Sequence, residues 1–236
     1  IVDIDKSADY ARASIEALAK SGIISGDEKG YFYPAKNVKR NEMVRIIISA
    51  IGADTTILPE KPTFRDVPKD NWAFKYVETA YRLGLVKGIS KDVFGADKEL
   101  SREEMAAMFV RAVGLDEETL KGNQADIYSR NLKDSNKISS WAREYVEFAL
   151  ASGIMQGTGN GNFSPSAPAQ RQQVAVVTDR FISKSDEINR FAASFKGKIQ
   201  HPELYYALAR YGEAYKGGIN MKMDLSMTDE SGRNSF

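Results

Sequence analysis

The chain has 236 residues, enough to bury a sizeable core as one large domain or two smaller ones. Its 33 lysines and arginines nearly balance its 32 aspartates and glutamates, and no long basic run occurs, which argues against a nucleic-acid-binding or membrane-surface protein. No stretch of about 18 apolar residues predicts a membrane span, and the absence of cysteine excludes disulfides. The first residues carry no basic and apolar leader, so we expect that the protein is not exported or that its leader is removed.

An internal repeat organises the chain. An arginine that opens an apolar helical pattern occurs three times, at Arg40, Arg102 and Arg171. The same two offsets relate four further sets of identical residues: Ala11, Ala73 and Ala142; Gly22, Gly84 and Gly153; Gly26, Gly88 and Gly157; and Phe32, Phe94 and Phe163. These identities predict three tandem copies of one unit, at about 1–54, 64–114 and 132–184.

Each copy opens with an aspartate two residues after an apolar residue, namely Asp3, Asp66 and Asp134. An aromatic residue before an alanine comes next, namely Tyr10, Trp72 and Trp141. A first helix should follow, with a buried stripe and with N-caps at Asp9, Asn71 and Ser140. The glycines at 22, 84 and 153 suit the left-handed residue that ends such a helix.

A loop rich in glycine, aspartate and asparagine then leads to the shared phenylalanine, and the arginine stretch begins a second helix with an apolar face. A short helix is predicted in the second linker, at Glu117 to Leu120. We therefore expect a mainly α fold of three helix-loop-helix units around one core, with pseudo-threefold symmetry. Residues 185–236 should form a linker and the start of a following domain, with helix at 185–195 and 202–215 and a strand at 219–228.

The repeated arginine has two interpretations. A cation in the first turn of a helix opposes the local dipole by about 0.3–1 kcal/mol, which an anionic ligand would explain. Free N–H groups at the helix start, loop glycines that admit close approach, and an aromatic face for a sugar ring would complete such a site. In the other interpretation each arginine pairs with Glu42, Glu104 or an opening aspartate and locks the copies together. The sequence leaves both open, although it favours core packing for Trp72 and Trp141.

Chemistry of other kinds has little support in the sequence. The loops lack the spacing of a calcium site, and the single histidine, His201, lies outside the repeats without a repeated acid or nucleophile. We therefore expect no enzyme activity, no metal and no cofactor.

The order of these features resembles the S-layer homology motif, over about residues 1–184. Its arginine tetrad matches Ser101-Arg102-Glu103-Glu104 most closely. Copy one has Lys39 before its arginine and keeps Glu42, whereas copy three has Gln170 and Gln173. Copy two departs in its loop, with Asp92 for a glycine and Ala96 for a proline. We therefore expect Arg102 to have the most complete tetrad but an imperfect loop, and Arg40 and Arg171 the reverse.

The resemblance implies a three-pronged, mostly helical pseudo-trimer with grooves between the prongs, in an extracellular protein of the bacterial cell wall or S-layer. It implies non-covalent anchoring through a secondary cell-wall polysaccharide, which often carries pyruvate ketals on an N-acetylhexosamine. Other S-layer subunits are a further expected partner. Two alternatives are a self-assembly module of an S-layer lattice with the arginines as inter-repeat pins, and the anchor of an extracellular enzyme that lies beyond residue 236.

The expected ligand-binding residues fall into four groups. These are the arginines Arg40, Arg102 and Arg171 with Ser101, Glu42, Glu104 and Gln173; the glycines Gly26, Gly88 and Gly157; the aspartates Asp3, Asp66 and Asp134; and the aromatics Tyr10, Trp72 and Trp141.

Overall fold

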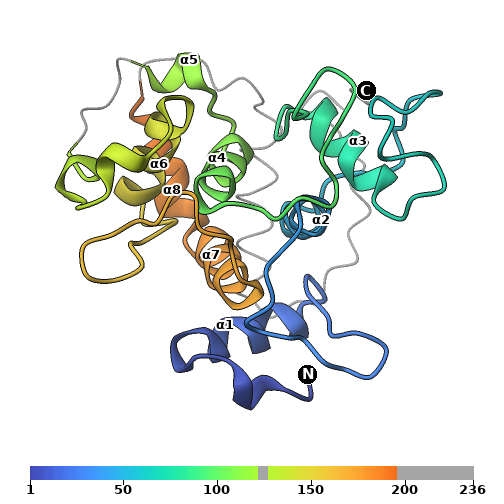
Figure 1. Cartoon of the computed structure of the whole chain (residues 1–236), viewed down its shortest axis with the longest axis horizontal. Coiled ribbons are helices and arrows are strands. Elements are labelled where there is room, and N and C mark those ends of the chain that lie inside the picture. The colour runs from blue at the N-terminus through green and yellow to red at the C-terminus, as the bar shows by residue number, and fades with distance from the viewer. Residues whose placement is uncertain (122–126, 196–236) are drawn as a thin grey trace, which may run out of the picture.

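The computed structural model describes residues 1–121 and 127–195 (Figure 1). The described helices are α1 Asp9–Lys20, α2 Arg40–Ala50, α3 Phe74–Arg82, α4 Arg102–Ala112, α5 Glu117–Leu120, α6 Arg143–Ala151, α7 Arg171–Ser183 and α8 Ser185–Ala193. The mainly helical fold and the short helix of the second linker are therefore as predicted. The predicted helix at 202–215 and the predicted strand at 219–228 lie outside the described residues.

The second helices of the three copies, α2, α4 and α7, meet at the centre of the molecule, and the first helices α1, α3 and α6 surround them (Figure 1). Each first helix packs on the second helix of the preceding copy: α3 on α2, α6 on α4 and α1 on α7. The apolar faces of the central helices are buried apart from Ile46 on α2, and the rings of Phe109 and Phe181 lie 5.1 Å apart between α4 and α7. A single copy therefore does not cover its own core, and the three copies interleave.

A closed ring of backbone hydrogen bonds joins the copies just before the second helices. The N–H of Val38 donates to the carbonyl of Ala169, that of Ala169 to Leu100, and that of Leu100 to Val38, each at 2.8 Å. The three residues occupy matched positions of the repeat. The ring gives the pseudo-threefold arrangement a backbone axis and leaves no end at which a fourth copy could be added.

The starts of the second helices are closed by neighbouring copies. The N–H groups of Arg40, Arg102 and Arg171 donate to carbonyls of an adjacent copy at 2.9, 3.0 and 2.9 Å. The next N–H group in each helix does the same, at 3.2, 3.0 and 2.9 Å. The expectation of free N–H groups that form an anion site is therefore wrong, because packing between copies uses these donors.

The ends of the first helices agree with the sequence better than their starts. Gly22, Gly84 and Gly153 have φ of 76, 71 and 75°, the left-handed conformation that was predicted. The predicted N-caps are wrong: α1 is capped by Ala8, α3 begins after Ala73, and Ser140 lies in a 3-10 turn before α6. In copy two the side chain of Asn71 instead accepts from the backbone N–H of Ala73 at 2.9 Å, just before α3 begins.

Helix α8 extends the core beyond the third copy. Ile188 and Ala192 are buried, and the ring of Phe191 packs 5.2 Å from that of Phe148 on α6. No helix in residues 1–121 and 127–195 is both long and apolar enough to cross a membrane.

Candidate ligand-binding grooves

Each repeated arginine reaches into the next copy. In the Arg40 junction, Nη1 lies 2.7 Å from Oε1 of Glu104, Nη2 donates to the carbonyl of Lys87 at 2.9 Å, and Nε donates to that of Phe94 at 3.2 Å. The guanidinium also lies over the Phe94 ring, 4.8 Å from its centroid. Arg40 belongs to copy one and all of these partners belong to copy two, so the arginine joins the two copies.

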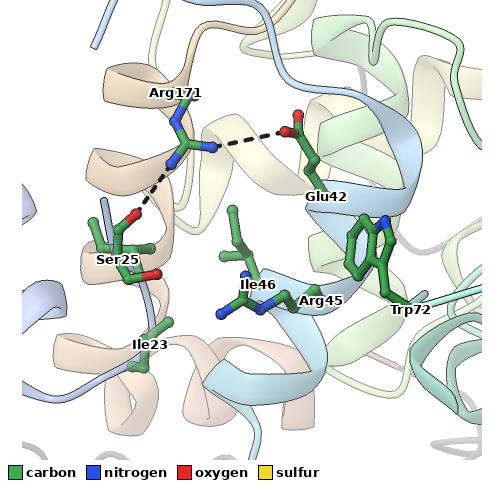
Figure 2. A pocket seen from close by; sticks show the side chains of 8 residues that line it. Ile23, Ser25, Glu42, Arg45, Ile46, Trp72 and Arg171 are labelled. Atoms are coloured by element: carbon green, nitrogen blue, oxygen red, sulfur yellow. Dashed lines mark hydrogen bonds and ion pairs between the residues drawn. The ribbon is translucent and has the colours of Figure 1, made fainter. Parts of the chain in front are cut away.

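The Arg171 junction repeats this arrangement between copies three and one. Nε donates to the Phe32 carbonyl at 2.7 Å and Nη2 to the Ser25 carbonyl at 3.3 Å, with the Phe32 ring 4.5 Å away. Nη1 is 3.8 Å from Oε1 of Glu42, a looser ion pair than that of Arg40 (Figure 2). Burial lowers the pKa of Arg171, and the charge of Glu42 partly offsets this effect.

The Arg102 junction, between copies two and three, lacks the acid. Nε and Nη2 donate to the carbonyls of Phe163 and Gln156 at 2.8 and 2.9 Å, but Gln173 stands where the other junctions have Glu104 or Glu42. In the described part of the chain, Arg102 forms no ion pair, although only 5% of it is exposed. Burial lowers its pKa to about 10, and Tyr10 and Asp134 offset this only in part.

The ranking of the copies expected from the sequence is therefore replaced by a different one. Glu104 completes the tetrad of Arg102 in the sequence, but in the folded protein it forms its ion pair with Arg40. Each acid caps its own helix, as Glu104 does by accepting from Ser101 N at 2.9 Å, and at the same time pairs with the arginine of the preceding copy. Arg40 thus has the tightest ion pair, and Arg102, with the most complete tetrad, has none among the described residues.

The opening aspartates hold the loops. Asp66 accepts from the backbone N–H groups of Phe94, Gly95 and Ala96 at 2.7, 2.7 and 3.0 Å, and Asp3 and Asp134 make matching bonds in their own copies. Burial alone would raise the pKa of Asp66, but the N–H donors lower it below its usual value. The same balance lowers the pKa of Asp3. These carboxylates fix the phenylalanine carbonyl on which the arginine docks.

The loop glycines are required by the loops themselves. A Cβ at Gly26 would lie 2.5 Å from the carbonyl carbon of Gly30, one at Gly88 2.3 Å from the Ser90 oxygen, and one at Gly157 2.7 Å from the Asn162 oxygen. All of these distances are shorter than a side chain tolerates. The close approach predicted for a ligand is thus already made by the backbone of each loop.

The repeated aromatic residues near the starts of the first helices are exposed. Trp72, Trp141 and Tyr10 are 52, 42 and 60% exposed, so the expected core packing of the tryptophans is wrong. Each precedes a buried alanine, and its ring remains outside the packed face. Trp72 lines a cavity of about 160 Å³ beside Arg171 and Glu42 (Figure 2). Trp141 lines one of about 440 Å³ beside Arg40 and Glu104.

These two cavities, called here the Arg171 groove and the Arg40 groove, are each built by all three copies. The arginine comes from one copy, the acid and the loop from the next, and the tryptophan from the remaining one. The structure thus brings together Arg171, Glu42 and Trp72 in one groove, and Arg40, Glu104, Trp141 and Gly88 in the other. Ser101 remains a cap residue, whose hydroxyl accepts from Glu104 N at 3.2 Å.

Sequence reasoning missed further cations in these grooves. Arg45 lines the Arg171 groove, and Lys87 and Arg111 line the Arg40 groove. Arg45 holds the register position of Ala107 and Val176, so a charge at an otherwise apolar position was the available signal. No cluster that could hold a metal ion occurs among residues 1–121 and 127–195.

Comparison with known proteins gives three matches to one family model. The model of the S-layer homology domain matches residues 1–44, 63–106 and 131–175, which correspond to the three copies.

The chain is similar to parts of proteins whose names indicate different roles. Over 187 residues the chain is 31% identical to the surface-layer 125 kDa protein of Lysinibacillus sphaericus, covering 78% of this chain and 15% of that protein. It is 31% identical over 185 residues to an amylopullulanase of Thermoanaerobacterium thermosulfurigenes, with 78 and 10% covered. Over 164 residues it is 26% identical to a cellulosome-anchoring protein of Acetivibrio thermocellus, with 69 and 36% covered. The chain therefore spans only a minor part of each of these relatives.

Proposed function

The chain belongs to the S-layer homology domain family. We propose that it attaches an extracellular surface protein non-covalently to the bacterial cell wall. Relatives named as a surface-layer protein, as a polysaccharide-degrading enzyme and as a cellulosome anchor share this part while the rest of each protein differs. A common attachment module joined to different cargo accounts for that distribution.

The proposed ligand is a secondary cell-wall polysaccharide with a carboxylate-bearing unit, such as a pyruvylated N-acetylhexosamine. One observation carries this proposal: each of the two grooves is lined by an exposed tryptophan and by a mostly buried arginine, and cations outnumber carboxylates on its walls. A sugar ring can stack on the tryptophan while its carboxylate meets the excess cation. In the Arg171 groove that cation is Arg45, which is exposed and shares the groove with the Arg171–Glu42 pair.

Two such grooves on one rigid body favour a polymer over a single sugar. When one chain of the polysaccharide occupies both grooves, avidity raises the affinity by about 10²–10⁴ over one site. Weak single sites therefore suffice for stable anchoring.

The test compares purified cell-wall polysaccharide before and after removal of its pyruvate groups. We expect the native polymer to bind and the depyruvylated polymer to lose at least about tenfold in affinity. Trp72→Ala and Trp141→Ala should each weaken binding, and together should abolish avidity, while circular dichroism and melting stay unchanged because both side chains are exposed. Equal binding of both polymers would contradict carboxylate recognition.

A second candidate is a structural module in which the arginines only pin the copies together, with other S-layer subunits as partners. The Arg40–Glu104 pair favours it, since this pair crosses between copies. It predicts that Trp72→Ala and Trp141→Ala leave polysaccharide binding unchanged, which distinguishes it from anchoring.

A further inference from the structure

The second linker, through α5, adds a second cavity beside the Arg40 groove. A second cavity of about 320 Å³ lies between α5, the end of α4 and Tyr145 of α6. It shares Lys87, Arg111 and Glu117 with the wall of the Arg40 groove, so the two cavities meet at these residues. The first linker, between α2 and α3, has no helix.

The groove and the second cavity follow one face of α4. Glu104, Ala107, Met108 and Arg111 line the groove at helical spacing, and the second cavity continues past Arg111 to Gly114 and Leu115. The eight residues from Glu104 to Arg111 span about 10 Å along the helix axis. A ligand that follows this face beyond Arg111 therefore enters the second cavity.

The wall beside α5 is held in place by its own packing. Asp116 caps α5 by accepting from Thr119 N at 2.9 Å, and Leu115 and Leu120 are buried. Glu117 pairs with Lys121 at 2.6 Å. The exposed Glu118 is left as the carboxylate at the mouth of the cavity.

Arg111 stands at the junction in a fixed orientation with donors to spare. Its Nε donates to the Tyr145 hydroxyl at 3.2 Å, and its guanidinium lies 4.7 Å from the centroid of the same ring. In the described part of the chain its two Nη groups have no hydrogen-bond or ion-pair partner. A guanidinium held in this way can donate to oxygens on both sides of the junction.

We propose that the cavity beside α5 is a second subsite, which takes the sugar next to the anionic unit in the Arg40 groove. The inference rests on the proposed function. Three carboxylates, Asp116, Glu117 and Glu118, line this cavity against the two cations Lys87 and Arg111. Because Glu117 is paired with Lys121, Asp116 and Glu118 balance Lys87 and Arg111, so the cavity offers no excess cation to a second carboxylate, whereas hydroxyl, amide or amino donors find acceptors there. The occupant is therefore a neutral or amino sugar, and the Arg40 groove together with the cavity beside α5 binds at least two consecutive sugars of the polymer.

The experiment is a calorimetric titration with two kinds of probe. The first is a methyl glycoside of a pyruvylated N-acetylhexosamine. The second is a pair of disaccharides that extend this sugar at one end or the other with a neutral N-acetylhexosamine. It is carried out in the Trp72→Ala background, so that the Arg40 groove dominates the signal. We expect one disaccharide to bind at least about tenfold more tightly than the monosaccharide. Glu118→Trp, which fills the mouth of the cavity, should remove this gain and leave the monosaccharide affinity unchanged.

A matched control is Glu16→Trp on α1, at the opposite side of the molecule from α5 (Figure 1), which should change neither affinity. Equal affinities of the mono- and disaccharides for the parent protein overturn the subsite and leave the proposed function standing. Equal weakening of both probes by Glu118→Trp also overturns it, because both would then occupy one site. If neither probe binds the unsubstituted protein, the proposed function and the subsite fail together.

Discussion

Nη1 of Arg40 lies 2.7 Å from Oε1 of Glu104, although Glu104 belongs to the tetrad of a different arginine. In the two tetrads that have an acid, Glu42 and Glu104 each face the arginine of the preceding copy, so the motif is completed only by contacts between copies. Each arginine junction is therefore composite, and a substitution in one copy changes the junction that it shares with a neighbour.

The first prediction compares two arginines that differ chiefly in their acid partner. Arg40→Met leaves the half-buried Glu104 without its counter-ion, and we expect the free energy of unfolding to fall by about 3 kcal/mol. Arg102→Met also loses two carbonyl contacts and a ring contact but removes a buried cation that has no acid partner. Its cost should be smaller by about 1–2 kcal/mol. Urea unfolding measures both.

The control for this comparison is Arg40→Met combined with Glu104→Gln, which removes both charges. It should be more stable than Arg40→Met alone, because the half-buried Glu104 carboxylate no longer lacks a counter-ion. Equal losses for Arg40→Met and Arg102→Met would show that the ion pair contributes nothing to their difference.

The second prediction gives Arg102 the acid that the other junctions have. Gln173→Glu should raise the pKa of Arg102 above about 10 and stabilise the fold by about 1 kcal/mol at pH 7. The pKa of the new carboxyl should fall below its unfolded value of about 4.3, so the gain is complete above pH ~4.3 and is lost as the pH falls further. In the Arg102→Met background the gain should vanish. A gain that persists there would have another origin.

Much of the fold can be predicted from the positions that match between the three copies of the repeat. Five identities in register located the three copies, and the apolar spacing located their second helices because burial requires that spacing. The starts of the first helices were missed, since Asp9, Asn71 and Ser140 resemble caps locally while packing sets where each helix begins. The interleaving of first and second helices depends on contacts between copies, which no single copy encodes.

The candidate site was predicted less well, for the same reason. The arginines and aromatics were found by their repetition, but the partner of each arginine lies in another copy and is invisible to an alignment of motifs. The helix N–H groups looked free because their acceptors, such as the Lys98 carbonyl for Arg40, come from a neighbouring copy. The sequence favours core packing for Trp72 and Trp141, and only the packed structure shows that both are exposed and line grooves.

The third prediction concerns acid stability. The pKa of Asp66 is lower in the folded protein than in the unfolded chain, so its contribution is complete above pH ~3.9 and is lost as the pH falls through the folded-state value. Asp66→Asn should cost about 2 kcal/mol at pH 7, because an amide replaces an acceptor of three N–H groups. The loss of stability between pH 4 and 2 should be shallower in the variant, as measured by urea midpoints across that range.

The control for Asp66 is Asp97, whose carboxylate pairs with Lys39 at the surface. Asp97→Asn should change stability by less than about 1 kcal/mol. If Asp66→Asn were equally mild, its three N–H contacts would not be holding the loop.

The last prediction concerns a hydrogen bond between copies that is made at two of the three boundaries and is missing at the third. Glu103 accepts from Ser139 N at 3.0 Å and Gln172 accepts from Ala8 N at 2.9 Å, each across a boundary between copies. At the matched position copy one has Asn41, one methylene shorter, and its buried Oδ1 has no partner. Because register places the N–H of Asp70 opposite it, Asn41→Gln should reach that donor and stabilise the fold by about 0.5–1.5 kcal/mol.

The measurement is the urea midpoint together with amide exchange at Asp70. Asn41→Gln should raise the midpoint and slow exchange of this N–H group, since a hydrogen bond protects it. Asn41→Leu, which removes the unpaired oxygen without adding a bond, separates the two effects: it should recover part of the stability and leave the exchange of Asp70 unchanged. Slower exchange in both variants would mean that packing at this boundary, and not the new hydrogen bond, protects the Asp70 N–H.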